Sequence, residues 1–116
     1  MLRKVLIVED DYAIAMEFQA ACEAAHCLVM GPVATEVEAL DLLSHDVPDI
    51  AIVDLNLGGG LTIKVASMLR DHAIPFCFAT GYDREMIPGE YMDVPHLQKP
   101  VDGDAIVRAI RELVRQ

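Results

Sequence analysis

The stretch Asp49-Ile-Ala-Ile-Val-Asp54 decides the fold, because it is the most strand-like segment of the chain and ends on an acid. A second run, Lys4-Val-Leu-Ile-Val8, is short, rich in β-branched residues and continuously apolar. Apolar runs of this kind are typical of strands in a sheet that is covered on both faces. The two runs therefore predict buried, parallel strands.

Three further runs predict strands at residues 27–30, 75–79 and 94–98. Between the strands, apolar residues recur at helical spacing, which predicts helices over residues 12–25, 35–45 and 61–72 and a last one starting at 102 or 103. Thr35 is the predicted N-cap of the second helix, with Glu38 completing a capping box. The segment after the fourth strand is weaker, since residues 83–87 offer about one helical turn before Pro88-Gly89. We expect any fourth helix there to be short or mobile.

The alternation of strands and helices predicts an α/β fold, with a doubly wound parallel sheet of five strands. A length of 116 residues without repeats or linkers predicts one domain, residues 1–116, with no output domain. The apolar run Val5–Val8 is too short for an export signal, and no apolar run reaches the roughly 18 residues of a membrane span. We therefore expect a cytoplasmic protein with no membrane partner.

The net charge of −10 argues against nucleic acid as a partner, because binding requires Lys and Arg to neutralise phosphates. An acidic balance favours divalent cations or a basic patch on another protein. Cys22, Cys27 and Cys77 lack the spacing of a metal site. Cys22 and Cys27 are expected to be small core residues.

Polar residues directly follow four of the predicted strands: Glu9, Asp10 and Asp11; then Asp54 and Asn56; then Thr80, Gly81 and Tyr82; then Lys99 and Pro100. The carboxyl ends of parallel strands meet at one edge of a sheet, where ligands bind. Taken singly, each residue could be a turn residue, a solvated charge or a helix cap, as Asp11 could be. Together, the acids would repel one another unless a cation lies among them, which predicts a Mg²⁺ site.

These same motifs resemble the signature of CheY-like receiver domains of two-component response regulators, over essentially the whole chain. They are Leu-Ile-Val-Glu9-Asp10-Asp11, Ile-Val-Asp54-Leu-Asn56, Ala-Thr80-Gly81 and Lys99-Pro100. Phe78-Ala79-Thr80-Gly81-Tyr82 is also similar to the motif of the alphaproteobacterial FATGUY single-domain regulators. The resemblance implies a flavodoxin-like (βα)5 fold with strand order 2-1-3-4-5.

The resemblance also implies a role for each strand-end residue. Asp54 would be the phosphoacceptor, and Mg²⁺ would be bound by Glu9, Asp10, Asp54 and the main-chain carbonyl of Asn56. Thr80 and Lys99 would bind the phosphoryl group, and the Lys99–Pro100 peptide would be cis. Asp11 would then be the cap of the first helix.

The sequence departs from the family three residues before the lysine, where an aromatic residue is usual and His96 stands. Either His96 or Tyr82 could be the switch residue that follows Thr80, while His96 could equally be a half-exposed strand residue. We expect Tyr82 and residues 83–92 to form the phosphorylation-sensitive surface. The run Gly58-Gly-Gly60 is expected to be a pliable rim of the acidic pocket, since it lacks the Lys-Ser/Thr of a phosphate-binding loop.

The favoured function is a phosphorylation-dependent binding switch that is not an enzyme in the ordinary sense but assists its own phosphorylation and dephosphorylation. Its expected partners are a sensor histidine kinase or histidine phosphotransfer protein, and an unknown downstream protein. A phosphate sink or phosphotransfer intermediate is the alternative, and a receiver that binds without phosphorylation is a further one. A haloacid-dehalogenase-like phosphatase is disfavoured, because it needs a second acid where Asn56 stands.

Overall fold

The computed structural model describes residues 2–58, 60–81 and 84–115. Its five strands are β1 (Lys4–Val8), β2 (Leu28–Val33), β3 (Ile50–Asp54), β4 (Phe76–Thr80) and β5 (His96–Gln98). All neighbouring strands pair in parallel, in the order β2-β1-β3-β4-β5. The predicted doubly wound, flavodoxin-like sheet is confirmed.

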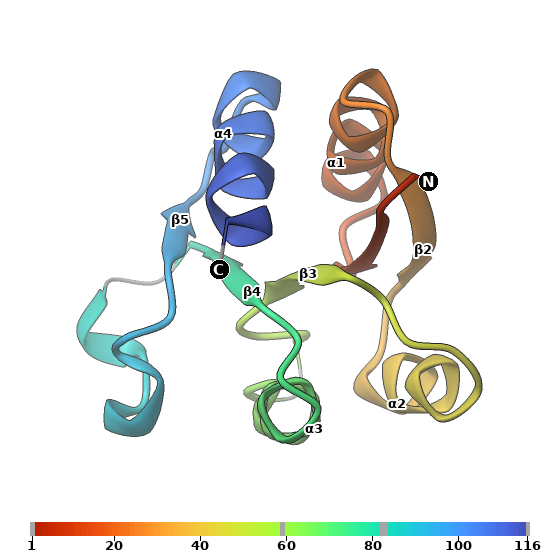
Figure 1. Ribbon diagram of the computed structural model, residues 1–116. Helices are drawn as coiled ribbons and strands as arrows, with labels where there is room; N and C mark the ends of the chain where they lie inside the picture. Colours follow the sequence, from red (N-terminus) through yellow and green to blue (C-terminus); the bar gives the residue numbers. More distant parts are fainter. Residues whose placement is uncertain (1, 59, 82–83, 116) are drawn as a thin grey trace.

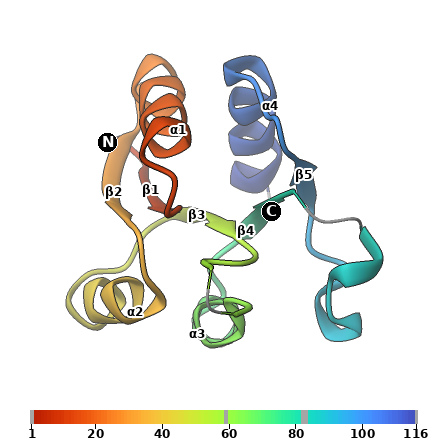
Figure 2. The same ribbon diagram turned by 180° about the vertical axis from the view of Figure 1, so that it is seen from behind.

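Helices cover both faces of this sheet, as Figure 1 and the reverse view in Figure 2 show. On one face α1 (Tyr12–Ala24) packs beside α4 (Gly103–Val114). On the other face α2 (Glu36–His45) packs beside α3 (Ile63–Asp71). Because side chains alternate along each strand, every central strand contributes to two separate hydrophobic cores.

Strand β1 illustrates this division. Val5 and Ile7 pack toward α1 and α4 with Phe18, while Leu6 and Val8 pack toward α2 and α3. Since both faces are buried from Val5 to Val8, these four residues must all be apolar, which is the pattern that made the strand recognisable in the sequence. The three cysteines Cys22, Cys27 and Cys77 are buried in the core on the α1 and α4 side, as expected for Cys22 and Cys27.

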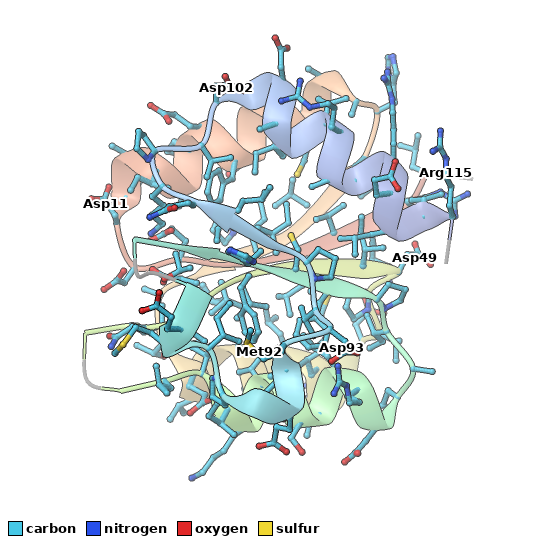
Figure 3. All side chains as sticks on the ribbon, turned by 90° about the vertical axis from the view of Figure 1, so that its left-hand side faces the viewer. Asp11, Asp49, Met92, Asp93, Asp102 and Arg115 are labelled. Carbon is cyan, nitrogen blue, oxygen red and sulfur yellow. The ribbon has the colours of Figure 1, made fainter. Side chains whose placement is uncertain are left out.

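Side-chain caps fix where three of the helices begin. Asp11 accepts from the Ile14 amide at the start of α1, and Asp102 accepts from Ala105 at the start of α4. Thr35 accepts from the Glu38 amide at the start of α2, as predicted. Figure 3 shows Asp11 and Asp102 at one end of the molecule and Asp49 and Arg115 at the other. The end with Asp11 and Asp102 is therefore the edge where the strands finish.

Strand β2 extends further than the sequence suggested, through the cis Gly31–Pro32 peptide to Val33. Gly31 has a φ of +96°, and a Cβ there would lie 3.1 Å from the carbonyl oxygen of Ile7, so glycine is required. The pairing of β1 with β2 shifts between Leu6 and Val8 at this point. The extension allows the Val33 carbonyl to accept from the amide of Glu9, which fixes the main chain just after β1.

The connection from β4 to β5 contains two short 3₁₀ turns, η1 (Arg84–Met86) and η2 (Gly89–Tyr91), in the position of the predicted short helix. We refer to residues 84–95 as the crossover segment. It lies beside α3 in Figure 1, and Tyr91 packs edge-on against Phe76 and Phe78 of β4.

Among the residues that the structure describes, none of the helices has the length and apolar character needed to span a membrane.

Candidate functional site

Four strand ends bring the predicted site residues to one edge of the sheet. Glu9 follows β1 directly, Asp54 is the last residue of β3, Thr80 is the last of β4, and Lys99 follows β5. The register places Asp54 beside Ala79, one residue before Thr80. The strand order and the register therefore bring these side chains close together, although the residues are far apart in the sequence.

Lys99 is the positive centre of the site. Its Nζ lies 2.6 Å from Oε1 of Glu9 and 3.0 Å from Oδ2 of Asp54. Both carboxylates are buried, with Glu9 2% and Asp54 6% exposed, so these ion pairs are shielded from water. One ammonium thus bridges acids from the first and third strands.

Glu9, Asp10 and Asp54 form an acidic cluster in which one oxygen from each lies within 4.8 Å of the others. Asp10 is exposed, whereas the other two acids are buried, so the cluster opens to solvent on the Asp10 side. Three acids outnumber the single ammonium of Lys99. Oxygen ligands at this separation, with an open side for water, are the set that Mg²⁺ accepts.

The pKa values of Glu9 and Lys99 reflect the crowding of charges in this cluster. Burial raises the pKa of Glu9 above its ordinary value, against the lowering effects of Lys99 and of the Asp11 amide. Burial alone would lower the pKa of Lys99, but hydrogen bonds to Glu9 and Asp54 outweigh it and raise that pKa overall. The ammonium is therefore held charged, and a further cation would favour the ionised form of Glu9.

Asp54 is fixed by neighbours on both carboxylate oxygens. Oδ1 accepts from the amide of Asn56 at 3.0 Å, and Oδ2 accepts from Lys99. The Asn56 side-chain oxygen accepts from the Gly58 amide at 2.7 Å, which closes a turn just after β3. Gly58 has a φ of +80° and its α-carbon lies next to Asp10, where a Cβ would be 3.7 Å from Oδ2. Gly58 is thus at the rim of the acidic cluster, whereas Gly59 lies outside the residues that the structure describes.

The end of β4 is joined to the lysine through the main chain. The carbonyl of Thr80 accepts from the amide of Lys99 at 2.8 Å, and Thr80 is 1% exposed. The Lys99–Pro100 peptide is cis. This arrangement places Thr80 next to the residue whose ammonium bridges Glu9 and Asp54.

The two candidates for a switch residue are placed differently. His96 is a half-buried residue of β5 that pairs with Phe78, and among the described residues no hydrogen bond or ion pair joins it to the acids or to Lys99. Tyr82 and Asp83 lie outside the residues that the structure describes. Their role as a switch remains a prediction.

Two residues near the site carried no signal in the sequence analysis. Thr62, just before α3, donates from Oγ1 to the main-chain oxygen of Asp54 at 2.9 Å. Glu36 of α2 accepts from the Val65 amide in the first turn of α3 at 3.0 Å. Thr62 falls within the stretch predicted as helix, and only its place before Ile63, typical of an N-cap, could have drawn attention to it. The partner of Glu36 lies too far along the chain for any sequence pattern to reveal.

Comparison with known proteins points to one family. The profile of the response regulator receiver domain matches residues 5–111. The chain resembles the solution structure of SdrG from Sphingomonas melonis Fr1, with 37% identity, a TM-score of 0.85 and 97% of each chain covered. It is 30% identical to the phyllosphere-induced regulator PhyR of Methylorubrum extorquens over 78% of this chain and 35% of that protein. An uncharacterised response regulatory protein of Vibrio cholerae is 26% identical over all of this chain and 50% of its own length.

The curated relatives are longer proteins. The chain spans half or less of the length of each of them, with coverage between 35% and 50%. The similarity therefore concerns the receiver part of these proteins. Membership of the narrower FATGUY subgroup remains a prediction.

Proposed function

Because the chain belongs to the response regulator receiver domain family of two-component signalling, we propose that it accepts a phosphoryl group on Asp54 in a Mg²⁺-dependent reaction. The modified site would control how the chain binds a partner protein. One observation carries this proposal. The Asp54 carboxylate is buried, held by Lys99 at 3.0 Å, and clustered with Glu9 and Asp10 within 4.8 Å.

The acidic cluster fits a divalent metal on its own chemistry. Oε1 of Glu9 is buried, and among the described residues its one polar partner is the Lys99 ammonium at 2.6 Å, so a metal ion would add a second. Glu9, Asp10, Asp54 and the main-chain carbonyl of Asn56 would hold Mg²⁺. When bound, Mg²⁺ would neutralise charge on the phosphoryl oxygens.

The protein's own residues would perform the remaining tasks. The Asn56 amide and Lys99 hold the Asp54 carboxylate in one orientation, which is what in-line attack requires. As the phosphoryl group arrives, Lys99 would move its interaction from Asp54 to a phosphoryl oxygen. The Thr80 hydroxyl would donate to another, so the position of Thr80 would depend on the state of Asp54.

The phosphoryl donor is proposed to be a phosphohistidine of a sensor histidine kinase or a histidine phosphotransfer protein. The P–N bond to imidazole breaks as the P–O bond to Asp54 forms, and the imidazole leaves. The product is an acyl phosphate that water hydrolyses later, so the chain would act as a switch that assists its own phosphorylation and dephosphorylation. It would not be a catalyst that turns over a separate substrate.

Uptake of a phosphoryl group from acetyl phosphate tests the proposal. Intact-mass spectrometry should show one added phosphoryl group with Mg²⁺ and none with excess chelator. Asp54→Asn, which keeps the side-chain size, should take up none. Asp49→Asn alters an acid at the opposite end of β3 and should leave the uptake unchanged. Metal-independent uptake, or uptake by Asp54→Asn, would contradict the proposal.

A further inference from the structure

The hydroxyl of Thr62 is bound to the end of β3 and not to its own helix. Oγ1 donates to the main-chain oxygen of Asp54 at 2.9 Å and also lies 3.3 Å from that of Leu55. The main-chain amide of Thr62 donates to Leu55 as well, at 2.9 Å. Thr62 is 1% exposed, so water does not replace this donor if it is removed. The peptide between Asp54 and Leu55 is therefore anchored by Thr62.

The position of Thr62 makes this use of its hydroxyl unexpected. It is the N-cap residue of α3, where a threonine ordinarily accepts a hydrogen bond from the first turn of its helix. Here Thr62 makes no such bond, whereas Asp11, Thr35 and Asp102 all cap their helices.

The missing cap of α3 is supplied from another helix. Oε2 of Glu36, in the first turn of α2, accepts from the amide of Val65 at 3.0 Å. A carboxylate at the N-terminus of a helix also interacts favourably with the helix dipole. Because Glu36 stabilises the start of α3, the Thr62 hydroxyl is not needed as a cap there. The contact of this hydroxyl with Asp54 is therefore not explained by a role in beginning the helix.

Thr62 also closes the loop that carries Asn56. Asn56 and Leu61 form an antiparallel bridge, and the Leu57 amide donates to Gly60 at 3.3 Å. Thr62 joins the two ends of this loop through its contacts with Asp54 and Leu55. The orientation of the Asp54–Leu55 peptide thus sets the course of the main chain as far as Asn56.

We propose that Thr62 is a positioning residue for phosphoryl transfer at Asp54, an inference that rests on the proposed function. All three acceptor atoms of Asp54 are held by different parts of the chain. Lys99 holds Oδ2, the Asn56 amide holds Oδ1, and the Thr62 hydroxyl holds the main-chain oxygen. Without the third contact, the peptide after Asp54 can rotate, which moves the carboxylate and the Asn56 carbonyl together. Displacements of about 1 Å can slow a reaction by up to about a hundredfold.

The test compares Thr62→Val, which removes the hydroxyl at nearly constant volume, with Thr62→Ser, which keeps it. Two quantities are measured for each folded variant: the limiting rate of Asp54 phosphorylation by acetyl phosphate, and the dissociation constant for Mg²⁺ from an NMR titration of ¹⁵N-labelled protein. Thr62→Val should lower the limiting rate by about tenfold or more and weaken Mg²⁺ binding, and Thr62→Ser should restore both. If Thr62→Val does not fold, Thr62→Cys, with its weaker donor, takes its place and should be intermediate.

Glu36→Gln is the matched control, because it weakens the cap of α3 and leaves the contact with Asp54 in place. It should lower the free energy of unfolding without changing the rate per folded molecule or the Mg²⁺ affinity. The inference is overturned if Thr62→Val reacts as fast as the wild type, or if Thr62→Ser is as slow as Thr62→Val. Wild type that takes up no phosphoryl group would instead overturn the proposed function, and the inference with it.

Discussion

The guanidinium carbon of Arg70 lies 4.9 Å from the centroid of the Tyr91 ring. The same side chain donates to the carbonyl of Glu90 at 2.8 Å and pairs with Asp93 at 3.1 Å. Arg70 stands in the last turn of α3, so it joins that helix to the crossover segment. Figure 3 labels Met92 and Asp93 of the crossover segment, and Asp93 is the residue that pairs with Arg70. These contacts of Arg70 stabilise the crossover segment, whose two short 3₁₀ turns would not keep it folded by themselves.

Replacement of Arg70 by alanine should therefore loosen the crossover segment. The exposed pair with Asp93 is worth little, so the expected loss of about 1–2 kcal/mol in the free energy of unfolding comes chiefly from Tyr91 and the Glu90 carbonyl. Hydrogen exchange of the amides of Met92 and Val94 should become faster. Lys64→Ala, which removes an exposed cation from the same helix, is the control. Equal exchange in Arg70→Ala and Lys64→Ala would contradict the assigned role.

Removal of the Lys99 ammonium should separate metal binding from phosphoryl transfer. In Lys99→Met the three acids lose their only described counter-charge, so the Mg²⁺ affinity should rise on the order of tenfold, since a unit charge a few ångström away is worth a few kcal/mol before screening. Phosphorylation of Asp54 should nevertheless become slower, because no ammonium neutralises the phosphoryl oxygens. Calorimetric titration and acetyl phosphate labelling measure the two effects.

A control for this prediction is Lys4→Met, since Lys4 pairs with Asp46 away from the strand-end acids. It should change neither the Mg²⁺ affinity nor the rate. Weaker Mg²⁺ binding in Lys99→Met would show that the ammonium does not compete with the metal for the acidic cluster.

Magnesium should stabilise the fold through the acidic cluster. A ligand bound by the folded state alone adds about 2.7 kcal/mol to the free energy of unfolding at one hundred times its dissociation constant. Urea unfolding with Mg²⁺ and with chelator should show this gain for the wild type and lose most of it in Asp10→Asn. Asp11→Asn changes the adjacent acid but keeps a good N-cap, so it should retain the gain. A gain of equal size in both variants would place the metal elsewhere.

Buried thiols should make the protein less stable at alkaline pH. Burial raises the pKa of Cys22 and of Cys77 to about 12, from an ordinary value of 9.0. Because the folded pKa is higher, the stabilisation is complete below pH 9 and is lost as the pH rises toward 12, by up to about 1.4 kcal/mol per pH unit and thiol. The free energy of unfolding, measured in urea between pH 8 and 11, should therefore decline less steeply for Cys77→Ala than for the wild type. Parallel curves would contradict the assigned burial effect.

The sequence predicted the strands and the strand-end chemistry because both depend on local patterns. A continuous apolar run such as Val5–Val8 predicts a buried strand by itself. An acid directly after a strand lies at the edge of the sheet where the strands end, in any parallel sheet. Glu9, Asp10, Asp54 and Lys99 accordingly came together.

Backbone conformation and contacts between distant residues could not be predicted from local patterns in the same way. The strand predicted at residues 27–30 stops before Gly31, but the positive φ of Gly31 lets β2 continue to Val33. The cap that Glu36 supplies to α3 and the packing of Arg70 on Tyr91 depend on helices meeting in space. A strand lies between the members of each pair, β3 in the first and β4 in the second, so no helical or strand period connects them.

The most direct test of the central claim is to locate the phosphoryl group. After reaction with acetyl phosphate and Mg²⁺, borohydride reduces an aspartyl phosphate to homoserine, which peptide mass spectrometry can assign to one residue. We predict homoserine at position 54 alone, and a loss of this signal when chelator replaces Mg²⁺. Homoserine at Asp10 or Asp11 in place of Asp54, or phosphate found on His96, would contradict the account.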